Sequence, residues 1–299
     1  MRRLRLGLVL PAVLLCAFSV APAANAGVTI GIADQKTDFL HDERFTELGI
    51  RHARISVPYD VLQDTDTLPA VDQWLLDAKA DGISPLVTFD RSRRPGRKSV
   101  TPSPAELARS LRGFRKRWPF IREFSTWNEG NINKNAKIVA KQWLALRKAC
   151  PSCTILGVDL VDHKNIARWA QDFVRAAGRT PKYWGLHNYV DVNQFTTKET
   201  KKLLRAVKGE FWLTETGGVV ERRNKSSVRF AGTGAQHAAK ATAFLFDKLA
   251  KVSKRIRRVY LYHWNSHPDA LSWDSGFIGP DGSIRPALDV LKARLKARR

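Results

Sequence analysis

The strongest constraint on the fold is an alternation that runs along most of the chain. Short segments rich in β-branched and aromatic residues recur, and segments with helical spacing of apolar residues follow them. We expect eight strands, at residues 28–33, 52–58, 84–89, 121–127, 154–160, 183–189, 210–214 and 258–264. The expected helices are residues 70–80, 104–117, 138–148, 166–177, 198–207, 236–252 and 286–297, with a shorter one at 37–48. Such alternation is typical of parallel sheets.

The number of these βα units favours one architecture. Eight units in about 270 residues fit the (β/α)8 or TIM barrel. The main rival is a doubly wound open sheet, but no glycine-rich nucleotide-binding motif follows any expected strand. No low-complexity linker divides the chain. The sequence therefore predicts an α/β fold, a (β/α)8 barrel formed by a single domain over residues 27–299.

Helix boundaries carry further local signals. Ser103 stands where the helix at 104–117 begins, with Pro104 in its first position and Glu106 in its third, which is the pattern of a capping box. Gly82 and Gly209 each follow an expected helix and precede an expected strand, as helix-ending glycines do.

The first 26 residues have the composition of a secretory signal peptide. A basic start precedes an apolar run over residues 6–20, and Ala24 and Ala26 form a small-x-small cleavage site. Pro11 interrupts the run, which is short for a membrane span. The alternative is an uncleaved N-terminal anchor. We expect a secreted, extracellular protein without a transmembrane segment after cleavage.

Two cysteines, Cys150 and Cys153, lie between an expected helix and an expected strand. Export permits disulfides, so this spacing favours a small local bridge. The alternative is a redox or metal-binding pair. No second cysteine pair or histidine cluster completes a metal site, and the sequence predicts neither a metal nor a cofactor.

Carboxylates stand at the ends of two expected strands. Glu129 follows the fourth strand and Glu215 follows the seventh. In a barrel of this kind the active site lies at the carboxyl ends of the strands, and these two strands face each other across the opening. Cleavage of a glycosidic bond with retention needs such a pair, one carboxylate to attack the anomeric carbon and one carboxylic acid to protonate the leaving oxygen.

The residues around this pair resemble a known superfamily. Trp127-Asn128-Glu129 and Thr214-Glu215 resemble the catalytic segments of the clan A retaining glycoside hydrolases. The resemblance spans the mature chain and implies Glu129 as acid/base, Glu215 as nucleophile, and further matches at the other strand ends. Those matches are Arg54 on strand two, His187 and Tyr189 on strand six, and Trp264 on strand eight. The sequence departs from this pattern at Gly130, where many members have proline. The resemblance therefore does not distinguish a xylosidase-like from a cellulase-like branch.

The chemistry of these residues indicates their roles in substrate binding. Arg54 has a permanent charge that would keep Glu215 ionised. Asn128 could bind the sugar 2-hydroxyl. Tyr189 could donate to the nucleophile, and His187 has the same parity on the strand and should point the same way.

Two tryptophans are candidate platforms for a sugar ring. Trp264 ends strand eight, and Trp273 lies in the loop after it. For any single tryptophan, packing in the core is the competing interpretation.

The chain is strongly basic, with a formal charge of +23. Basic residues crowd the loops after strands three and seven, on the expected active-site face, and this motivates an anionic glycan as substrate. Those residues are Arg91, Arg93, Arg94, Arg97, Lys98, Arg222, Arg223 and Lys225. Basic residues also occur elsewhere, so a solvated basic surface is the competing interpretation.

Three functions compete. The first is a secreted retaining glycosidase that acts on a polysaccharide or oligosaccharide. The alternative is a catalytically inactive carbohydrate-binding barrel protein, although binding alone needs no carboxylate pair. A nucleic-acid-binding protein is indicated by charge only, and since no nucleic-acid-binding motif is present, we expect no such partner. Sugar, linkage, endo or exo action and oligomeric state stay open.

Overall fold

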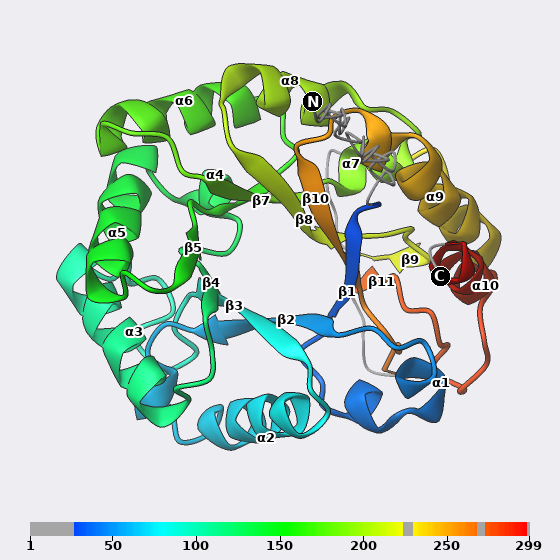
Figure 1. Ribbon diagram of the computed structural model, residues 1–299, viewed down its shortest axis with the longest axis horizontal. Coiled ribbons are helices and arrows are strands. Elements are labelled where there is room, and N and C mark those ends of the chain that lie inside the picture. Colours follow the sequence, from blue (N-terminus) through cyan, green and yellow to red (C-terminus); the bar gives the residue numbers. More distant parts are fainter. Residues whose placement is uncertain (1–26, 224–229, 268–272, 298–299) are drawn as a thin grey trace, which may run out of the picture.

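Parallel strands form a ring at the centre of the molecule, and helices surround it (Figure 1). This computed structural model describes residues 27–223, 230–267 and 273–297; the predicted signal peptide and Lys225 lie outside them. The ring strands are β1 (Thr29–Ala33), β2 (His52–Pro58), β3 (Ser84–Asp90), β4 (Glu123–Ser125), β5 (Thr154–Leu156), β6 (Asp159–Val161), β7 (Tyr183–His187), β8 (Glu210–Thr216) and β10 (Ile256–Tyr262). Their order is β5-β4-β3-β2-β1-β10-β8-β7-β6.

The predicted fifth strand is divided into β5 and β6. β5 pairs with β4, and β6 pairs with β7. The backbone N–H of Gly157 donates to the carbonyl of Tyr183 at 2.9 Å, and that of Asp159 donates to Trp127 at 3.0 Å, so these bonds complete the ring. A side chain at Gly157 would collide with Pro181, which explains the glycine at this break. The predicted eight-stranded α/β barrel is confirmed.

Seven helices make up the outer layer of the described chain. They are α2 (Leu68–Ala80), α3 (Pro104–Arg117), α5 (Ala136–Ala149), α6 (Ile166–Ala177), α8 (Lys198–Ala206), α9 (Ala235–Asp247) and α10 (Pro286–Lys296). Shorter elements are η1 (Asp38–His41), α1 (Glu43–Thr46), η2 (Val61–Gln63), α4 (Gly130–Asn133), α7 (Tyr189–Asn193) and η3 (Leu249–Lys251). The helices predicted at 37–48 and 236–252 are each divided in two. No described helix is both long enough and apolar enough to span a bilayer.

The helix-boundary predictions hold in part. The Ser103 side chain accepts the N–H of Glu106 at 3.1 Å, which confirms the N-cap of α3. The Glu106 carboxylate does not complete the capping box, because it accepts a hydrogen bond from Arg97 at 2.7 Å instead. Gly82 has a φ of +66° after α2, as a helix-ending glycine requires.

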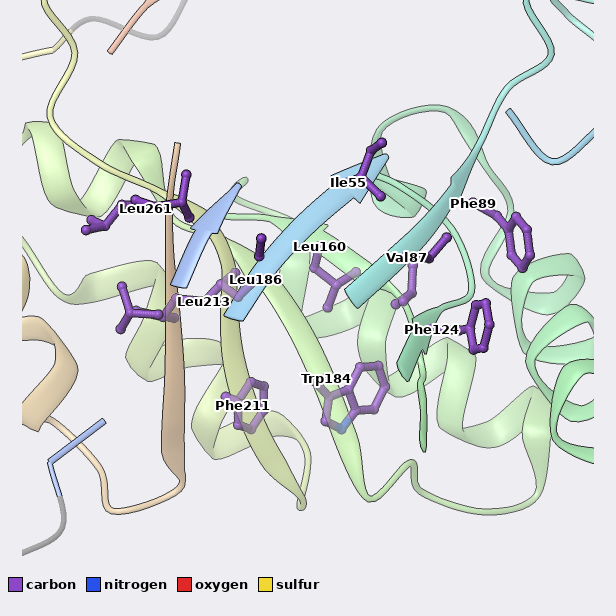
Figure 2. Packing of buried hydrophobic residues seen from close by; sticks show 14 of the residues in the cluster. Ile55, Val87, Phe89, Phe124, Leu160, Trp184, Leu186, Phe211, Leu213 and Leu261 are labelled. Atoms are coloured by element: carbon purple, nitrogen blue, oxygen red, sulfur yellow. The ribbon is translucent and has the colours of Figure 1, made fainter. Parts of the chain in front are cut away.

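Alternate side chains of each strand face the helices and the barrel interior. Ile55, Val87, Phe124 and Leu213 face the helices and belong to the main apolar core, as Figure 2 shows for this set. A second apolar cluster fills the barrel interior with Ala33, Leu86, Leu156, Trp212 and Tyr260.

Beneath that interior cluster a partly buried ion pair lies towards the amino ends of the strands. Arg258 donates to both carboxylate oxygens of Glu123, at 2.6 and 2.9 Å. Its guanidinium lies 3.8 Å from the centre of the Trp212 ring. Glu123 and Arg258 therefore neutralise each other's charge at this end of the barrel.

A small second sheet lies after the seventh and eighth barrel strands. β9 (Glu221–Arg222) pairs antiparallel with β11 (Trp273–Asp274), and Trp273 is opposite Arg222. This pairing joins the two loops and fixes Trp273 beside the carboxyl ends of the strands.

The predicted disulfide between Cys150 and Cys153 is present. It links the end of α5 to the start of β5, at the opposite end of that strand from the carboxyl edge. No group of three or more potential metal ligands occurs among the described residues, and the cysteines are bonded to each other.

Candidate active site

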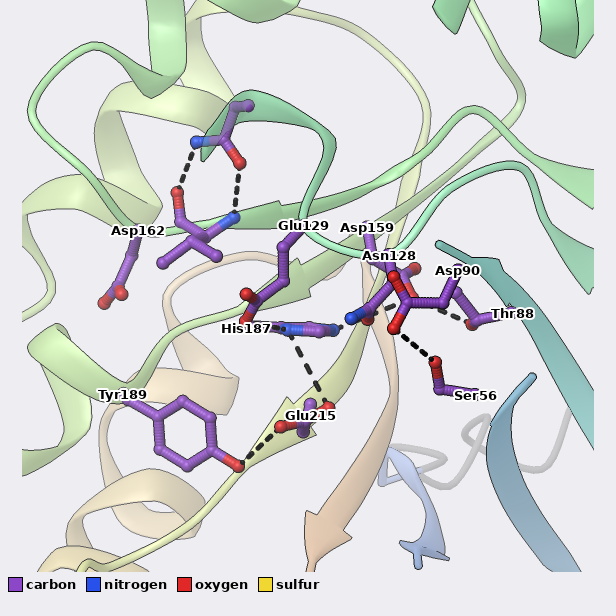
Figure 3. A network of polar contacts seen from close by, with 12 residues as sticks. Ser56, Thr88, Asp90, Asn128, Glu129, Asp159, Asp162, His187, Tyr189 and Glu215 are labelled. Atoms are coloured by element: carbon purple, nitrogen blue, oxygen red, sulfur yellow. Dashed lines mark hydrogen bonds and ion pairs between the residues drawn. The ribbon is translucent and has the colours of Figure 1, made fainter. Parts of the chain in front are cut away.

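Glu129 and Glu215 lie on either side of one histidine. The Nδ1 atom of His187 is 3.1 Å from Oε1 of Glu129 and 3.9 Å from Oε2 of Glu215 (Figure 3). The two carboxylate oxygens are therefore at most about 7 Å apart, a range that includes the separation of about 5–5.5 Å in retaining glycosidases. The two strand-end carboxylates converge on one place, as their positions predict.

Glu215 reaches this place through an irregularity in β8. Gly185 pairs with Trp212 and His187 pairs with Glu215, so β8 has one extra residue against β7. Trp212 faces the barrel interior, and simple alternation would turn Glu215 towards the helices. The bulge turns the carboxylate to the interior, which is how bulges beside active sites commonly act.

Glu129 is positioned by the turn after β4. Its φ of +51° places it in the left-handed region just before α4. Its side chain is 42% exposed, whereas that of Glu215 is 15% exposed. A side chain at Gly130 would come within 2.6 Å of Val158, so close packing explains the glycine at this position.

Arg54 joins most of the site in one network. Its guanidinium donates to Glu215 at 2.9 Å, to Asp159 at 2.7 Å and to Asn128 at 2.9 Å. Burial disfavours the charge on Arg54, but the Asp159 and Glu215 carboxylates outweigh burial and raise its pKa. The cation is fully buried, and its two carboxylate partners compensate its charge.

Sequence reasoning missed Asp159. This fully buried carboxylate accepts from Thr88 at 2.9 Å and Ser125 at 2.7 Å in addition to Arg54. Burial would raise its pKa, but Arg54 and His187 lower it, so Asp159 is ionised. Gly185 leaves room for it, because a side chain there would overlap the Asp159 carboxylate. An aspartate inside an apolar strand was the available signal.

Tyr189 reaches the site from a helix rather than from a strand. β7 ends at His187, and α7 begins at Tyr189, because the buried Asp162 carboxylate accepts the N–H groups of Val190 at 3.2 Å and Asp191 at 2.7 Å. The Tyr189 hydroxyl donates to Oε1 of Glu215 at 3.2 Å. Burial and the Glu215 charge raise the pKa of Tyr189, so its hydroxyl stays a donor.

His187 is charged in this setting. Burial disfavours its cationic form, but the nearby Glu215, Asp159 and Glu129 carboxylates raise its pKa to about 9. Burial also disfavours the anion of Glu129, yet the hydrogen bond and charge of His187 lower the pKa of Glu129. One proton therefore lies between the two residues, nearer to the histidine.

The prediction of Trp264 as a sugar platform is wrong. Trp264 is fully buried, its indole N–H donates to Asp42 at 2.9 Å, and its ring packs edge-on against Phe45. Trp273 is only partly buried and lies edge-on to Tyr189, with ring centres 4.7 Å apart. Trp273 keeps some exposed surface, and its role as a sugar platform stays a prediction.

A cavity of about 590 Å³ opens beside Glu129. This volume is within the usual range for small-ligand sites. The lining residues are Asp90, Arg91, Lys98, Ser99, Trp127, Asn128, Glu129 and Lys134. Asn128 and Glu129 thus face open space, while Arg54, Asp159 and His187 support the site from below.

Solved structures share this fold. No protein-family model and no curated protein matches the chain. A family 39 glycoside hydrolase from Bacteroides cellulosilyticus has 15% identity and a TM-score of 0.58, over 91% of this chain and 64% of that one. Xylanase 10B from Thermotoga maritima has 9% identity and a TM-score of 0.61, over 92% and 96%.

A third structure belongs to another hydrolase family. It is a GH5_18 protein from Streptomyces cattleya in complex with GlcNAc, with 12% identity and a TM-score of 0.60, over 91% of this chain and 80% of that one. At these identities the likeness concerns the fold. The chain shares the (β/α)8 barrel fold of these glycoside hydrolases.

Proposed function

We propose that this protein is a secreted retaining glycosidase in which Glu215 is the nucleophile and Glu129 the acid/base. The observation that carries this proposal is the unequal environment of two converging carboxylates. Glu215 is mostly buried and accepts hydrogen bonds from Arg54 and Tyr189, which suits an ionised nucleophile. Glu129 is more exposed and lines the cavity, where a leaving group could contact it.

In the first step Glu215 attacks the anomeric carbon of the bound sugar. A bond forms between a Glu215 oxygen and that carbon, while the bond from the carbon to the leaving oxygen breaks. Glu129 donates a proton to the leaving oxygen, so the departing sugar leaves as a neutral alcohol. Arg54 and Tyr189 hold Glu215 in place for the attack.

In the second step water releases the sugar. Glu129, now a carboxylate, removes a proton from water, and the water oxygen attacks the anomeric carbon as the bond to Glu215 breaks. Two inversions at one carbon retain its configuration. Glu129 is protonated again, and Glu215 is again a carboxylate.

His187 takes part in supplying the proton for the leaving group. A general acid needs a proton, but His187 lowers the pKa of Glu129. The proton is nevertheless available, because His187 and Glu129 share it across 3.1 Å. Donation to the leaving oxygen then leaves neutral His187 and ionised Glu129, and deprotonation of water restores the pair.

Secretion is part of the same proposal. Its support is the N-terminal signal sequence together with the Cys150–Cys153 disulfide, because disulfides persist in oxidising compartments. Export from a bacterial host and sequencing of the mature protein test it, and we expect the chain to begin at Gly27. An intact N-terminus held in the membrane would indicate an anchor.

The decisive test is a panel of neutral and acidic polysaccharides and aryl glycosides, with Glu215→Gln as control. We expect turnover that disappears in the control, and a product that keeps the anomeric configuration of the substrate in a time-resolved NMR spectrum. Inverted product would contradict the nucleophilic role of Glu215. Glycan binding without any turnover would favour the inactive carbohydrate-binding barrel.

A further inference from the structure

We propose that the cavity beside Glu129 binds an acidic group of the glycan, a carboxylate, sulfate or phosphate, through Arg91, Lys98 and Lys134. This inference rests on the proposed glycosidase function, because the acid/base residue Glu129 lines the same cavity. It assigns the substrate class: an acidic rather than a neutral glycan.

The three cations lie on two segments that meet at the cavity. Arg91 and Lys98 belong to the loop between β3 and α3, and Lys134 follows α4. Arg91 and Lys98 are exposed, and among the residues that the structure describes no carboxylate lies within 4.0 Å of any of the three ammonium or guanidinium groups. The charges are thus available to a ligand.

Other arginines of the same loop are used differently. Arg97 donates to Glu106 at 2.7 Å and lies 3.5 Å from Asp60, and Arg94 lies 3.7 Å from Asp60. These two arginines hold the loop to the barrel, and neither lines the cavity. The loop therefore has paired cations that fix its shape and unpaired cations that face the cavity.

Lys134 is held in position by two uncharged contacts. Its ammonium donates to the Thr101 hydroxyl at 2.8 Å and lies 5.1 Å from the centre of the Trp127 ring. Burial lowers the pKa of Lys134, which an anion nearby would reverse. An acidic group in the cavity would add to the charge of Asp90, which already favours the Lys134 cation.

Two carboxyl groups also line the cavity. Glu129 has the charged His187 as its partner. Asp90 accepts hydrogen bonds from the Ser56 hydroxyl at 3.4 Å (Figure 3) and from the backbone N–H of Arg91 at 2.7 Å, and burial raises its pKa. Arg91, Lys98 and Lys134 outnumber these two groups. The remaining charge that faces a ligand is therefore positive, and electrostatic attraction favours an anion there.

The test measures binding to the Glu215→Gln protein, so that turnover is not needed. The probes are a uronic-acid oligosaccharide, a sulfated one, a phosphorylated one and a neutral one of equal length. We expect one acidic probe to bind more tightly than the neutral one, and the difference to shrink as salt is added. The probe that binds best identifies the acidic group.

Charge-removing variants locate the site. Arg91→Gln and Lys98→Gln should each weaken binding of the acidic probe by up to about fivefold and leave the neutral probe unchanged. Arg93→Gln is the matched control, because this exposed arginine is on the same loop but does not line the cavity. Equal losses in all three variants, or equal binding of acidic and neutral probes, would overturn the proposal.

Turnover by the wild-type protein is measured separately. Cleavage confined to neutral glycans overturns the acidic substrate and leaves the glycosidase intact. Binding of the acidic probe without cleavage of any glycan supports the anion site and contradicts the catalytic proposal.

Discussion

His187 Nδ1 lies 3.1 Å from Glu129 Oε1, within hydrogen-bond distance, while His187 is fully buried and Glu129 is open to the cavity. The pair thus connects an enclosed group to the place where a leaving oxygen would be protonated. The proton held between the two residues is lost to solvent only when His187 deprotonates. The pH range of activity therefore depends on both residues.

The first prediction concerns pH and His187. In the wild-type protein the alkaline limb of kcat/KM should lie near pH 9, where His187 loses its proton. His187→Asn leaves Glu129 to hold the proton alone, and the limb should move to lower pH by more than one unit. A pH–rate profile measures this, with the exposed His41→Asn as control. An unmoved limb would mean that the pair does not share the catalytic proton.

The same histidine should make stability depend on pH. Its pKa is raised from 6.5 to about 9 in the folded protein, so its contribution is complete below pH 6.5 and is lost as pH rises through 9. Urea unfolding between pH 6 and 10 should show this decline. The decline should be smaller in His187→Asn. Equal slopes of unfolding free energy against pH in both proteins would refute the raised pKa of His187.

Glu129→Gln separates the acid role from the base role. The variant cannot protonate a leaving group, so hydrolysis of substrates with poor leaving groups should slow by about 10²–10⁴-fold. Activated aryl glycosides need little acid assistance and should still form the covalent intermediate, which a burst phase would reveal. The exposed Glu47→Gln should match the wild type. If both substrate types slow equally, Glu129 is not the acid.

Asp159→Asn tests the support beneath the site. The variant keeps the shape of the side chain but removes a buried negative charge 2.7 Å from Arg54, and should cost about 3 kcal/mol of unfolding free energy. The exposed Asp172, which pairs with Arg175 on α6, is the matched control, and Asp172→Asn should cost less than about 1 kcal/mol. Equal costs in urea denaturation would rule out the supporting role.

The disulfide should contribute modestly to stability. It closes a loop between residues three apart in sequence, and chain entropy then gives about 2 kcal/mol. Urea midpoints with and without reductant measure this, and the double variant Cys150→Ser/Cys153→Ser should not respond to reductant. Activity should persist, because the bridge lies at the opposite end of β5 from the site. Lost activity in a folded, reduced protein would indicate a redox role.

Several site residues could be predicted because their positions on the strands bring them together. Asn128 and Glu129 follow β4 and Glu215 lies near the end of β8, and the carboxyl ends of parallel strands meet at one edge. Arg54 lies within β2 and points into the same barrel. Within the network of the site, the sequence predicts the contacts of Arg54 and Tyr189 with Glu215. Its other links require side-chain packing between distant segments, which local patterns do not encode.

The surroundings of Trp264 and Asp159 could not be predicted from the sequence. Trp264 lies just beyond β10 rather than at its end, and contacts from Phe45 and Asp42 near the start of the chain enclose it. Asp159 looked like one polar residue in an apolar strand, and only the barrel interior gives it Arg54 and Ser125 as partners. Both outcomes depend on contacts between residues far apart in sequence.

The extra residue in β8 makes the direction of the nucleophile depend on how the strand pairs as well as on which residues it contains. If β8 kept its length and paired with β7 without the bulge, Glu215 would stand three regular positions after Trp212 and would point towards the helices, away from Arg54. In a strand shortened by one residue between Trp212 and Glu215, the glutamate would stand two positions after Trp212 and would point into the barrel without any bulge. Relatives of this chain are therefore best compared by the length of this strand as well as by its glutamate.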